Sequence, residues 1–404
     1  MKIEKSHFLN ALLEDHTVPP LYKTLTYGFN GALFYQNTAS KLSPKDKNIG
    51  LQVHIAFPKF LKPEIHGETQ GVDFKTIEQH QQDCFGIVIA PEITDINQYL
   101  NAHFNKNSRT PIIKKMKRLE HCFHIHYKVF YGDITQKNYT YLMALAHGML
   151  LRRFQQRQDD NFILRDWEKY HSILYPLILE KKASLFVIYN GTEPIQISIN
   201  FHFGKTFFAY IPAYNIDYAQ FGLGNTAVYK QLEWCIANHY VYLDMGNGDL
   251  EYKKRWCNYH YVLETHIFYR TKNIRSRLSA NKAFYKIKLK NIVKDVLKSE
   301  LYNKIKLKFP INRPNISHLK TESYTIKNIT SIQDFKPDVL LEIDFKNHCD
   351  YPQIINKPIY DFLYKTQEHL DNIIVYKIKN QNNCIIIKGK TKAIHLCFDS
   401  SISL

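Results

Sequence analysis

The stretch VYLDMGNGDLEYKKRWC, residues 241–257, crowds an acid, a phenol and three basic side chains around a glycine-rich turn. Glycine tolerates positive φ and lets the backbone approach a ligand closely, which accounts for Gly246 and its neighbour. Turn chemistry does not account for Asp244 before the turn or for Tyr252 and Lys253 after it. An acid, a phenol and a cation are residue types that could serve a reactive cleft.

The same residues allow a purely structural interpretation. EYKKRW fits an amphipathic helix in which Tyr252 and Trp256, four residues apart, pack on the core while the basic side chains stay in water. Asp244 would then only cap the following turn, as aspartates commonly do. Both interpretations hold together if one side chain packs and its neighbour points into the cleft.

A second glycine loop precedes a predicted helix in NIDYAQFGLGNTAVYKQL. The first turn of a helix offers unpaired backbone N–H groups and the positive end of the helix dipole, so such a loop suits a pyrophosphate. The candidate binding residues are Gly222, Leu223, Gly224, Asn225 and Thr226. The alternative is that the glycines serve only the turn, with Asn225 or Thr226 capping the helix. Asp217, just before the loop, is either a base that serves the acceptor or a turn cap.

One histidine-rich segment offers metal-ligand types. HCFHIH predicts Cys122, His124 and His126 on one face of a strand. No fourth ligand is apparent nearby and the spacing is not that of a zinc site, so we expect no metal. Cys235 and Cys257 are conceivable nucleophiles, but neither has an evident histidine or asparagine setting, and buried thiols are the commoner case.

Composition indicates a globular protein of two or three domains. The 404 residues are 45% hydrophobic and 14% aromatic, unlike a disordered chain. The N-terminal MKIEKSHFLNALLEDHT lacks the features of a secretory signal, and the longest apolar runs are too short to span a bilayer. The seven scattered cysteines form no CxxC pair, which suits reduced thiols. We therefore expect a cytoplasmic protein without a transmembrane segment.

The net charge of +17 is concentrated in one segment. Residues 253–320 hold 18 Lys and Arg against three acids, a net charge of +15. Such a block usually marks a polyanionic partner, here RNA, an anionic membrane surface or a phosphorylated substrate. The alternative is a solvated basic face, because lysine dominates the block and lysine imposes little geometry on a partner.

The elements that must position the candidate residues follow one another between residues 135 and 270. The patterns predict two helices, three strands, a helix opened by the glycine loop, a strand, a short helix and a final strand. The Asn-Gly pair at 190–191 predicts a hairpin between the first two strands.

A long basic helix is predicted next. The apolar residues that share one face of it are Tyr285, Leu289, Ile292, Val293 and Val296. The helix either packs on its own domain with this face or lies on a membrane.

Four regions follow from these patterns: residues 1–131, an N-terminal α/β half; 132–275, the domain with the candidate site; 276–319, a basic helical segment; and 320–404, a small α+β region. In the first region IGLQVHIAF, CFGIVIA and HCFHIHYKVFYG predict strands, and DINQYLNAHF predicts an Asp-capped helix. TPIIKKMKRLE predicts a helix with Pro111 in its first turn. In the last region IIVYKIKNQNNCIIIKG predicts a hairpin.

The order of elements and three segments of sequence resemble the GNAT acyltransferases. The segments are NAHFNKNSRTPIIKKMKRLE, WEKYHSILYPLILEKKASLFVIYNGTEPIQISINF and FGLGNTAVYKQLEWCIANHYVYLDMGNGDLEYKKRW. They are similar to the group named after cellulose-biosynthesis acetyltransferases, which is related to the Fem aminoacyl transferases of peptidoglycan synthesis. The resemblance covers about residues 90–275 and implies a mixed α/β fold, a central mixed sheet flanked by helices. It also implies tandem GNAT-like halves, with residues 1–131 as a degenerate first half.

The resemblance implies roles for the candidate residues. In GNAT enzymes the glycine loop holds coenzyme A, and Gly222 to Gly224 match its Arg/Gln-x-x-Gly-x-Gly pattern, although Ala219 stands at the Arg/Gln position. Asp244 lies at the end of the strand that splays away to admit the acyl-pantetheine. Tyr252 is the candidate acid that protonates the departing thiolate. In the Fem branch a Phe-Lys-x-x-Phe pattern puts a lysine at the reacting ester, and Lys253 takes that place.

These roles imply an acyl-CoA-dependent N-acyltransferase, with acetyl-CoA or another acyl-CoA as co-substrate. An amine of a small molecule or of a cell-envelope precursor would attack the thioester directly. One alternative is a Fem-like transferase that takes an aminoacyl group from tRNA, which the basic block would suit. Another is a GNAT-fold protein that binds an acyl-CoA or a polyanion without turnover, which the imperfect glycine pattern allows.

Overall fold

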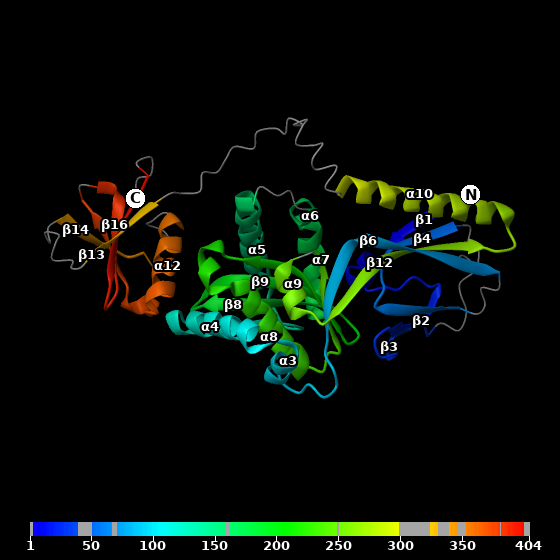
Figure 1. The fold of residues 1–404 in the computed structure, drawn as a ribbon, viewed down its shortest axis with the longest axis horizontal. Helices are drawn as coiled ribbons and strands as arrows, with labels where there is room; N and C mark the ends of the chain where they lie inside the picture. Colours follow the sequence, from blue (N-terminus) through cyan, green and yellow to red (C-terminus); the bar gives the residue numbers. More distant parts are fainter. Residues whose placement is uncertain are drawn as a thin grey trace.

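The computed structural model describes nine stretches of the chain (Figure 1). They are residues 3–38, 51–66, 71–157, 162–248, 250–298, 324–329, 339–345, 353–379 and 381–399. Most of them form one large mixed sheet with helices on both faces, and those after 324 form a small separate sheet with a helix against it. No helix in these stretches is both long and apolar enough to cross a membrane. The mixed α/β fold predicted from the sequence is confirmed.

The large sheet has nine strands in the order β1-β4-β12-β6-β11-β10-β9-β8-β7. Their bounds are β1 Ile3–His7, β4 Leu51–Pro58, β6 Val72–Val88, β7 Ile125–Phe130, β8 Ala183–Asn190, β9 Glu193–Phe203, β10 Thr206–Tyr214, β11 Tyr242–Asn247 and β12 Tyr259–Arg270. Its neighbours are antiparallel except for β1 with β4 and β10 with β11. Because β12 lies between β4 and β6, strands from both predicted halves share one sheet, and the boundary at residue 131 stays a prediction.

Helices cover both faces of this sheet (Figure 1). Their bounds are α1 Phe8–Leu13, α3 Ile96–His103, α4 Lys106–Cys122, α5 Gln136–Arg157, α6 Phe162–Arg165, α7 Trp167–Leu179, α8 Leu223–Ala237, α9 Glu251–Trp256 and α10 Ile274–Lys298, with the 3-10 helix η1 at Ile216–Phe221. On one face α5 and α7 pack in the largest core cluster, which contains Leu174 and Phe201. On the other face α3, α8 and α9 form a second cluster around Leu232 and Trp256.

A three-stranded sheet of β3-β2-β5 packs beside the first strands of the large sheet. Its bounds are β2 Tyr22–Tyr27, β3 Leu33–Gln36 and β5 Leu61–Ile65. It closes the core on the side of β4 and β12 that α10 leaves uncovered (Figure 1).

From residue 136 to 270 the elements are α5, α7, β8, β9, β10, α8, β11, α9 and β12, with the short α6 and η1 between them. This is the predicted order. β8 and β9 form the predicted hairpin, and Gly191 in its turn has φ 56°, a value that glycine adopts without strain. Local turn chemistry therefore sets the order of elements around the candidate site.

The N-terminal region contains the predicted strands and helices with two corrections. Helix α4 begins at Lys106 because Asn105 caps it, so Pro111 lies in the second turn and not in the first. The same helix runs through Cys122, and the strand predicted from residue 121 starts only at Ile125.

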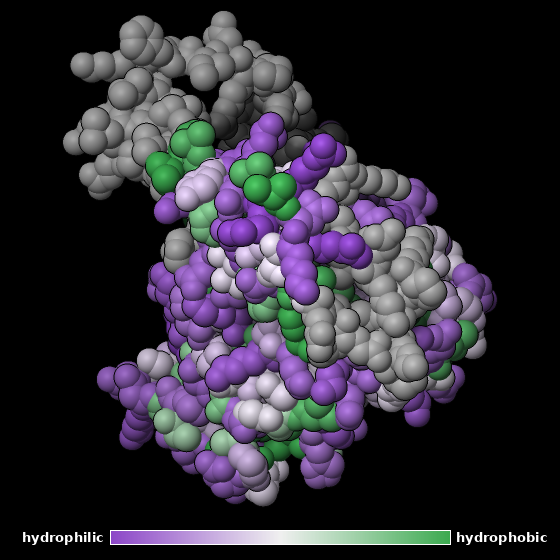
Figure 2. Space-filling view, turned by 90° about the vertical axis from the view of Figure 1, so that its right-hand side faces the viewer, coloured by the Kyte–Doolittle hydropathy of each residue, from purple (hydrophilic) through white to green (hydrophobic). Residues whose placement is uncertain are grey.

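Helix α10 lies along the outer strands of the large sheet (Figure 1). Its packed face presents Ala280, Ala283, Phe284 and Ile287 to β4, β6 and β12. The predicted apolar face is therefore wrong as a packing face. Its residues Tyr285, Leu289, Ile292 and Val293 are all exposed, while the side chain of Val296 lies outside the described residues. Figure 2 shows this end of the molecule, where hydrophobic and strongly hydrophilic side chains lie next to one another on the surface.

The C-terminal sheet has the order β13-β17-β16-β15-β14. Its elements are β13 Tyr324–Ile329, β14 Leu340–Ile343, β15 Ile374–Ile378, β16 Gln381–Lys388 and β17 Ala393–Phe398, with α12 Asn356–Thr366. β15 and β16 form the predicted hairpin. Helix α12 packs on α4 and η1, with the ring of Tyr360 centred 4.4 Å from that of Tyr218.

Candidate active site

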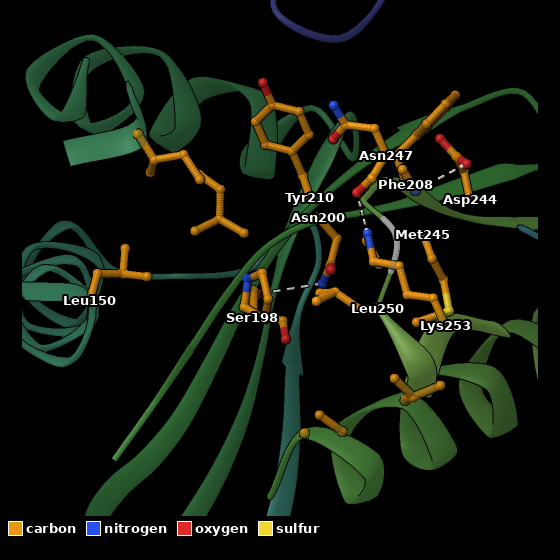
Figure 3. Close-up of a pocket in the computed structure, with 18 of the residues that line it drawn as sticks. Leu150, Ser198, Asn200, Phe208, Tyr210, Asp244, Met245, Asn247, Leu250 and Lys253 are labelled. Carbon is orange, nitrogen blue, oxygen red and sulfur yellow. Dashed lines mark hydrogen bonds between the residues drawn. The ribbon is translucent and has the colours of Figure 1, made fainter. Parts of the chain in front are cut away.

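A cavity of about 1100 Å³ opens where β10 and β11 separate (Figure 3). Their parallel ladder covers only three residue pairs and ends at Phe208 opposite Asp244. Beyond that pair β10 carries a bulge between Ala209 and Ile211, which re-aims the strand. Residues of β9, β10, β11, β12, α5, α7, α8 and α9 line the cavity, so every element of the predicted order except β8 contributes to it.

The glycine loop forms one wall of this cavity. Gly222 adopts the left-handed conformation with φ 70° and links η1 to α8, and Gly222 to Asn225 line the cavity. Thr226 is buried in the same turn. The Asn225 side chain accepts a 2.9 Å hydrogen bond from the indole of Trp256, which ties this loop to α9. The loop is thus held rigidly with its first-turn amides at the cavity.

Sequence reasoning missed a cation beside this loop. A Cβ atom placed on Gly222 would lie 3.3 Å from the Cδ atom of Lys115, so the lysine stem of α4 passes close to the loop. The usual Arg/Gln position holds Ala219, so Lys115 is the basic side chain near the loop here. No local signal pointed to it, because α4 meets α8 only through the tertiary fold.

Asp244 lies within β11, at the point where its pairing with β10 ends, and it is buried and faces the cavity. Its Oδ1 accepts hydrogen bonds from the hydroxyl of Tyr261 at 2.8 Å and from the N–H of Gly246 at 3.2 Å. Burial raises the pKa of Asp244 to about 6, against the opposing effect of these two hydrogen bonds and of Lys253. The Gly246 bond is the predicted turn cap, so capping and exposure to the cavity coexist in one side chain.

Lys253 and Tyr252 line the cavity from α9. Lys253 is buried, and its Nζ donates a 2.5 Å hydrogen bond to the carbonyl of Asn247 in the glycine-rich turn. Burial lowers the pKa of Lys253, while the negative charge of Asp244 acts in the other direction. Burial raises the pKa of Tyr252, with the nearby Arg153 opposing. The structure therefore brings Asp244, Tyr252 and Lys253, the three residues predicted as catalytic, to one cavity.

Asp217 has a different environment. Its carboxylate forms two hydrogen bonds with the guanidinium of Arg152, at 3.0 and 3.1 Å, and its N–H is capped by Asn215. The side chain is buried in this ion pair and lies outside the cavity lining. A contact between Asp217 and substrate stays a prediction.

The cavity also has a polar floor that sequence reasoning missed. Ser198 and Asn200 of β9, labelled in Figure 3, line this floor. Gln231 of α8 lines it as well, and all three residues are buried. The Ser198 hydroxyl accepts from Gln231 Nε2 at 3.2 Å, whereas the amide oxygens of Asn200 and Gln231 have no hydrogen-bond partner among the described residues. Such acceptors suit N–H or O–H groups of a ligand. The polar residues at alternate positions of the apolar segment EPIQISINFHF were the available signal.

The thiols near the site are not activated. Burial raises the pKa of Cys84 and of Cys257 to about 12, and the charges of Asp244 and Lys253 act on these pKa values to a smaller extent. Burial also raises the pKa of Cys235 far above its usual range. A thiol that stays protonated is a poor nucleophile, so covalent catalysis by cysteine finds no support here.

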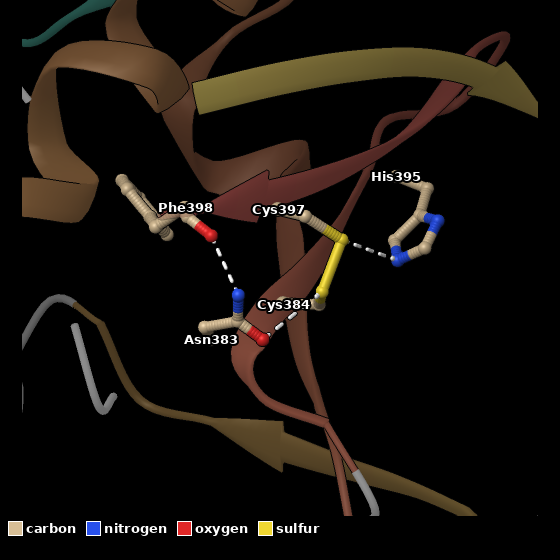
Figure 4. The surroundings of a disulfide bond; sticks show 5 residues. All are labelled: Asn383, Cys384, His395, Cys397 and Phe398. Carbon is tan, nitrogen blue, oxygen red and sulfur yellow. Dashed lines mark hydrogen bonds between the residues drawn. A yellow bond between two sulfur atoms is a disulfide. The ribbon is translucent and has the colours of Figure 1, made fainter. Parts of the chain in front are cut away.

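Two cysteines of the C-terminal sheet correct the expectation of reduced thiols throughout. Cys384 and Cys397 lie opposite each other on β16 and β17 and form a disulfide, with His395 Nε2 3.3 Å from Cys397 Sγ (Figure 4). Their partnership depends on strand pairing, so their scattered positions in the sequence did not indicate it.

The candidate metal ligands Cys122, His124 and His126 point to different places. The Sγ of Cys122 faces the carbonyl of Leu363 at 3.7 Å, and His126 stacks on Tyr189. The Nε2 of His124 instead lies 2.7 Å from the Oδ2 of Asp371 in the C-terminal region. Ligand-type atoms of His124, His369 and Asp371 lie within 4.8 Å of one another, close enough to share a metal ion. These three residues already interact with one another through hydrogen bonds and ion pairs.

Two splayed parallel strands, a bulged strand and a glycine-opened helix lie within one stretch of the chain that matches a known family. Residues 106–254 match the family model of the acetyltransferase (GNAT) domain, so this part of the chain is similar to GNAT acetyltransferases. No protein of curated function matches the chain in sequence.

Solved structures with similar folds share little sequence with this chain. FemX is 12% identical over 55% of this chain and 73% of that one, with a TM-score of 0.38. A conserved protein of unknown function from Bacteroides thetaiotaomicron VPI-5482 is 9% identical over 54% and 69%, with a TM-score of 0.35. A functionally unknown conserved protein from Staphylococcus epidermidis ATCC 12228 is 11% identical over 54% and 72%, with a TM-score of 0.29. At these values the similarities carry no argument about function.

Proposed function

We propose that this chain is an acyl-CoA-dependent N-acyltransferase, with acetyl-CoA or another acyl-CoA as donor. One observation carries the proposal: β10 and β11 separate beyond the Phe208–Asp244 pair and open a cavity. A glycine-opened helix lines this cavity, and so do Tyr252 and Lys253 of α9. The GNAT domain of residues 106–254 supports the same class of reaction.

The donor would lie with its pyrophosphate against the first-turn amides of α8, residues 222–226. The positive end of the helix dipole favours an anion there, and Lys115 adds a positive charge beside Gly222. The N–H groups of Gly222, Asn225 and Thr226 already donate to backbone carbonyls, so the amides of Leu223 and Gly224 are the donors that would face the pyrophosphate. The pantetheine arm would pass between β10 and β11. This path would bring the thioester to the end of the cavity where Asp244 and Lys253 lie.

In the proposed reaction the acceptor amine attacks the thioester carbonyl. A C–N bond forms, the C–S bond breaks, and coenzyme A leaves as a thiolate. Asp244, whose pKa of about 6 suits a general base near neutral pH, would take the proton that the amine loses. Tyr252, which its raised pKa keeps protonated, would return a proton to the thiolate. Lys253 would stabilise the oxyanion of the tetrahedral intermediate.

The acceptor would be an amine of a small molecule or of a cell-envelope precursor. The unpaired oxygens of Asn200 and Gln231 would accept hydrogen bonds from it or from the donor. Because acyl-CoA is made and used inside cells, the proposed donor also supports a cytoplasmic site of action.

Calorimetric titration with coenzyme A and acetyl-CoA tests the donor site. A Cβ atom on Gly224 would meet no protein atom within 4 Å, so Gly224→Val should fold normally while its side chain enters the space of the donor. We expect the affinity of this variant to fall at least about tenfold. Gly148→Val is the matched control, because Gly148 lies in α5 with equal room around its Cβ. Wild-type affinity in Gly224→Val would contradict the assignment of the glycine loop.

A Fem-like transfer from aminoacyl-tRNA is the second candidate. Lys253 holds the place of the Fem lysine and is buried at the cavity, which favours this reading as well. Binding of tRNA that weakens steeply with salt, together with no binding of coenzyme A, would select it. Coenzyme A binding without transfer to any amine would instead favour a GNAT-fold protein that binds without turnover.

A further inference from the structure

Helix α10 has a second apolar face, opposite to the one that packs on the sheet. The packed face is built from Ala280, Ala283, Phe284 and Ile287. The exposed apolar residues, with their exposed fractions, are Ile274 71%, Leu278 62%, Tyr285 65%, Leu289 62%, Ile292 50% and Val293 48%. Soluble proteins scatter single exposed apolar residues, but a contiguous set on one helix marks an interaction surface.

The spacing of these residues makes them a continuous stripe. At about 100° per residue, positions 274, 278, 285, 289 and 292 fall within about 60° of the helix circumference, and residue 293 borders them. At about 1.5 Å per residue the stripe is about 29 Å long. The packed residues lie roughly on the other side of the helix, so docking on the sheet leaves the whole stripe free.

Basic side chains flank the stripe on both sides. The exposed cations between residues 274 and 293 are Arg275, Arg277, Lys282, Lys286, Lys288 and Lys290. The same segment contains no aspartate or glutamate. An apolar stripe bordered only by positive charge is complementary to a surface with an apolar interior and an anionic rim.

We propose that α10 docks this protein in the plane of an anionic lipid bilayer, with the stripe in the acyl boundary and the cations at the head groups. Long basic side chains can bury their stems beside the stripe and keep their charges at the head groups. RNA fits this surface less well, because aliphatic Ile, Leu and Val side chains offer neither base stacking nor hydrogen bonds. A second copy of the chain fits less well too, since two such helices would bring like charges together.

Co-sedimentation of the full chain with vesicles tests the proposal. We expect binding to phosphatidylcholine vesicles that contain phosphatidylglycerol, and little binding to pure phosphatidylcholine vesicles. The double variant Leu278→Asn with Leu289→Asn should weaken binding at least about tenfold. Each substitution removes the free energy gained when a leucine side chain moves from water into the bilayer. Both leucines are exposed, so the melting temperature should stay near that of the wild type.

Leu33→Asn is the matched control, because Leu33 is 56% exposed on β3, away from α10. It should bind vesicles like the wild type. The proposal is overturned if phosphatidylglycerol vesicles do not bind at low salt, or if the double variant binds as tightly as the control. It is also overturned if light scattering shows a dimer that the double variant abolishes, because the stripe would then be a contact between two copies of the chain. A further contrary result is full vesicle binding by the double variant together with competition by tRNA, because the lysines alone would then account for binding.

Discussion

Strand β12 carries two buried polar clusters that differ in their access to the cavity. Near the start of the strand, Tyr261 donates a 2.8 Å hydrogen bond to Asp244. Five residues further on, His266 and His54 share the hydroxyl of Tyr22, at 3.0 and 3.1 Å. Asp244 and Tyr261, with Lys253 nearby, line the cavity, and we call them the open cluster. Tyr22, His54 and His266 lie outside its lining, and we call them the sealed cluster.

By residue type the sealed cluster resembles a catalytic site more closely. The Tyr22 hydroxyl, the His266 ring and the Glu264 carboxylate form a hydrogen-bonded chain, with His266 Nε2 3.1 Å from the carboxylate. A nucleophile, its base and an orienting acid are arranged in the same way in many catalytic sites. Burial and the neighbouring His266 lower the pKa of His54 to about 4, and burial raises the pKa of Tyr22 well above its usual value. The hydroxyl is therefore not activated. Access to a cavity, more than residue type, separates the candidate site from a structural network.

Removing the cation of the open cluster has the largest expected effect. Lys253→Ala should lower turnover about 100- to 1000-fold, because a charge beside a developing oxyanion stabilises mainly the transition state. Coenzyme A affinity should stay within a few-fold of the wild type. The control is Lys254→Ala, whose side chain is 45% exposed on the same helix. Steady-state kinetics and melting temperatures decide: wild-type turnover, or a large loss of stability, would make Lys253 a structural residue.

Asp244→Asn should separate activity from stability in the same cluster. Burial raises the pKa of the wild-type Asp244 carboxyl to about 6 from its ordinary value of 3.8, so between these pH values the folded state binds more protons than the unfolded state. The free energy of unfolding therefore falls as pH rises through this window. Above it Asp244 is ionised, and its buried charge destabilises the folded state. The uncharged asparagine should raise stability at pH 8 by about 1–3 kcal/mol and change it little at pH 4.

The same variant should lose about a hundredfold in turnover, because asparagine cannot accept the amine proton. Wild-type turnover should fall as pH drops below about 6, where Asp244 becomes protonated. Thermal melts and pH–rate profiles measure both effects. A variant that is both less stable and fully active would contradict the assigned role.

A substitution in the sealed cluster should have the smallest effect on turnover, in contrast to the substitutions at the cavity. Tyr22→Phe removes one hydroxyl and leaves ring nitrogens of His54 and His266 without that partner. We expect a loss of about 1–3 kcal/mol in the free energy of unfolding, the usual cost of unpaired buried polar groups. Turnover per folded molecule should stay at the wild-type level. Denaturant titration with parallel kinetics checks this, and a selective loss of turnover would mean that the two clusters communicate.

Local signals were enough to predict the elements around the site. The Asn-Gly turn, the glycine loop and the strand pattern around Asp244 each act over a few residues, so their order could be predicted from the sequence. The polar floor of Asn200 and Gln231 could not, because it exists only when β9 and α8 face each other. Lys115 could not be predicted either, because α4 meets α8 only in the tertiary fold.

Helix α10 shows a different limit of sequence patterns. A helix with apolar residues on two sides has the same periodicity whichever side meets the protein. Two small residues, Ala280 and Ala283, belong to the packed face, while bulkier residues such as Tyr285 and Leu289 stay outside. Spacing predicted an amphipathic helix but not which of its faces would be buried.

The docking of α12 on η1 has a consequence for the glycine loop. Tyr360 of α12 packs on Tyr218, and η1 leads directly into Gly222. The C-terminal region therefore braces the segment that sets the left-handed turn of the proposed donor site. Two binding events that share one segment are thermodynamically coupled: whatever factor docking adds to donor affinity, the donor must add to docking. In this molecule the element that leads into the glycine loop is packed by a helix more than 130 residues downstream of that loop.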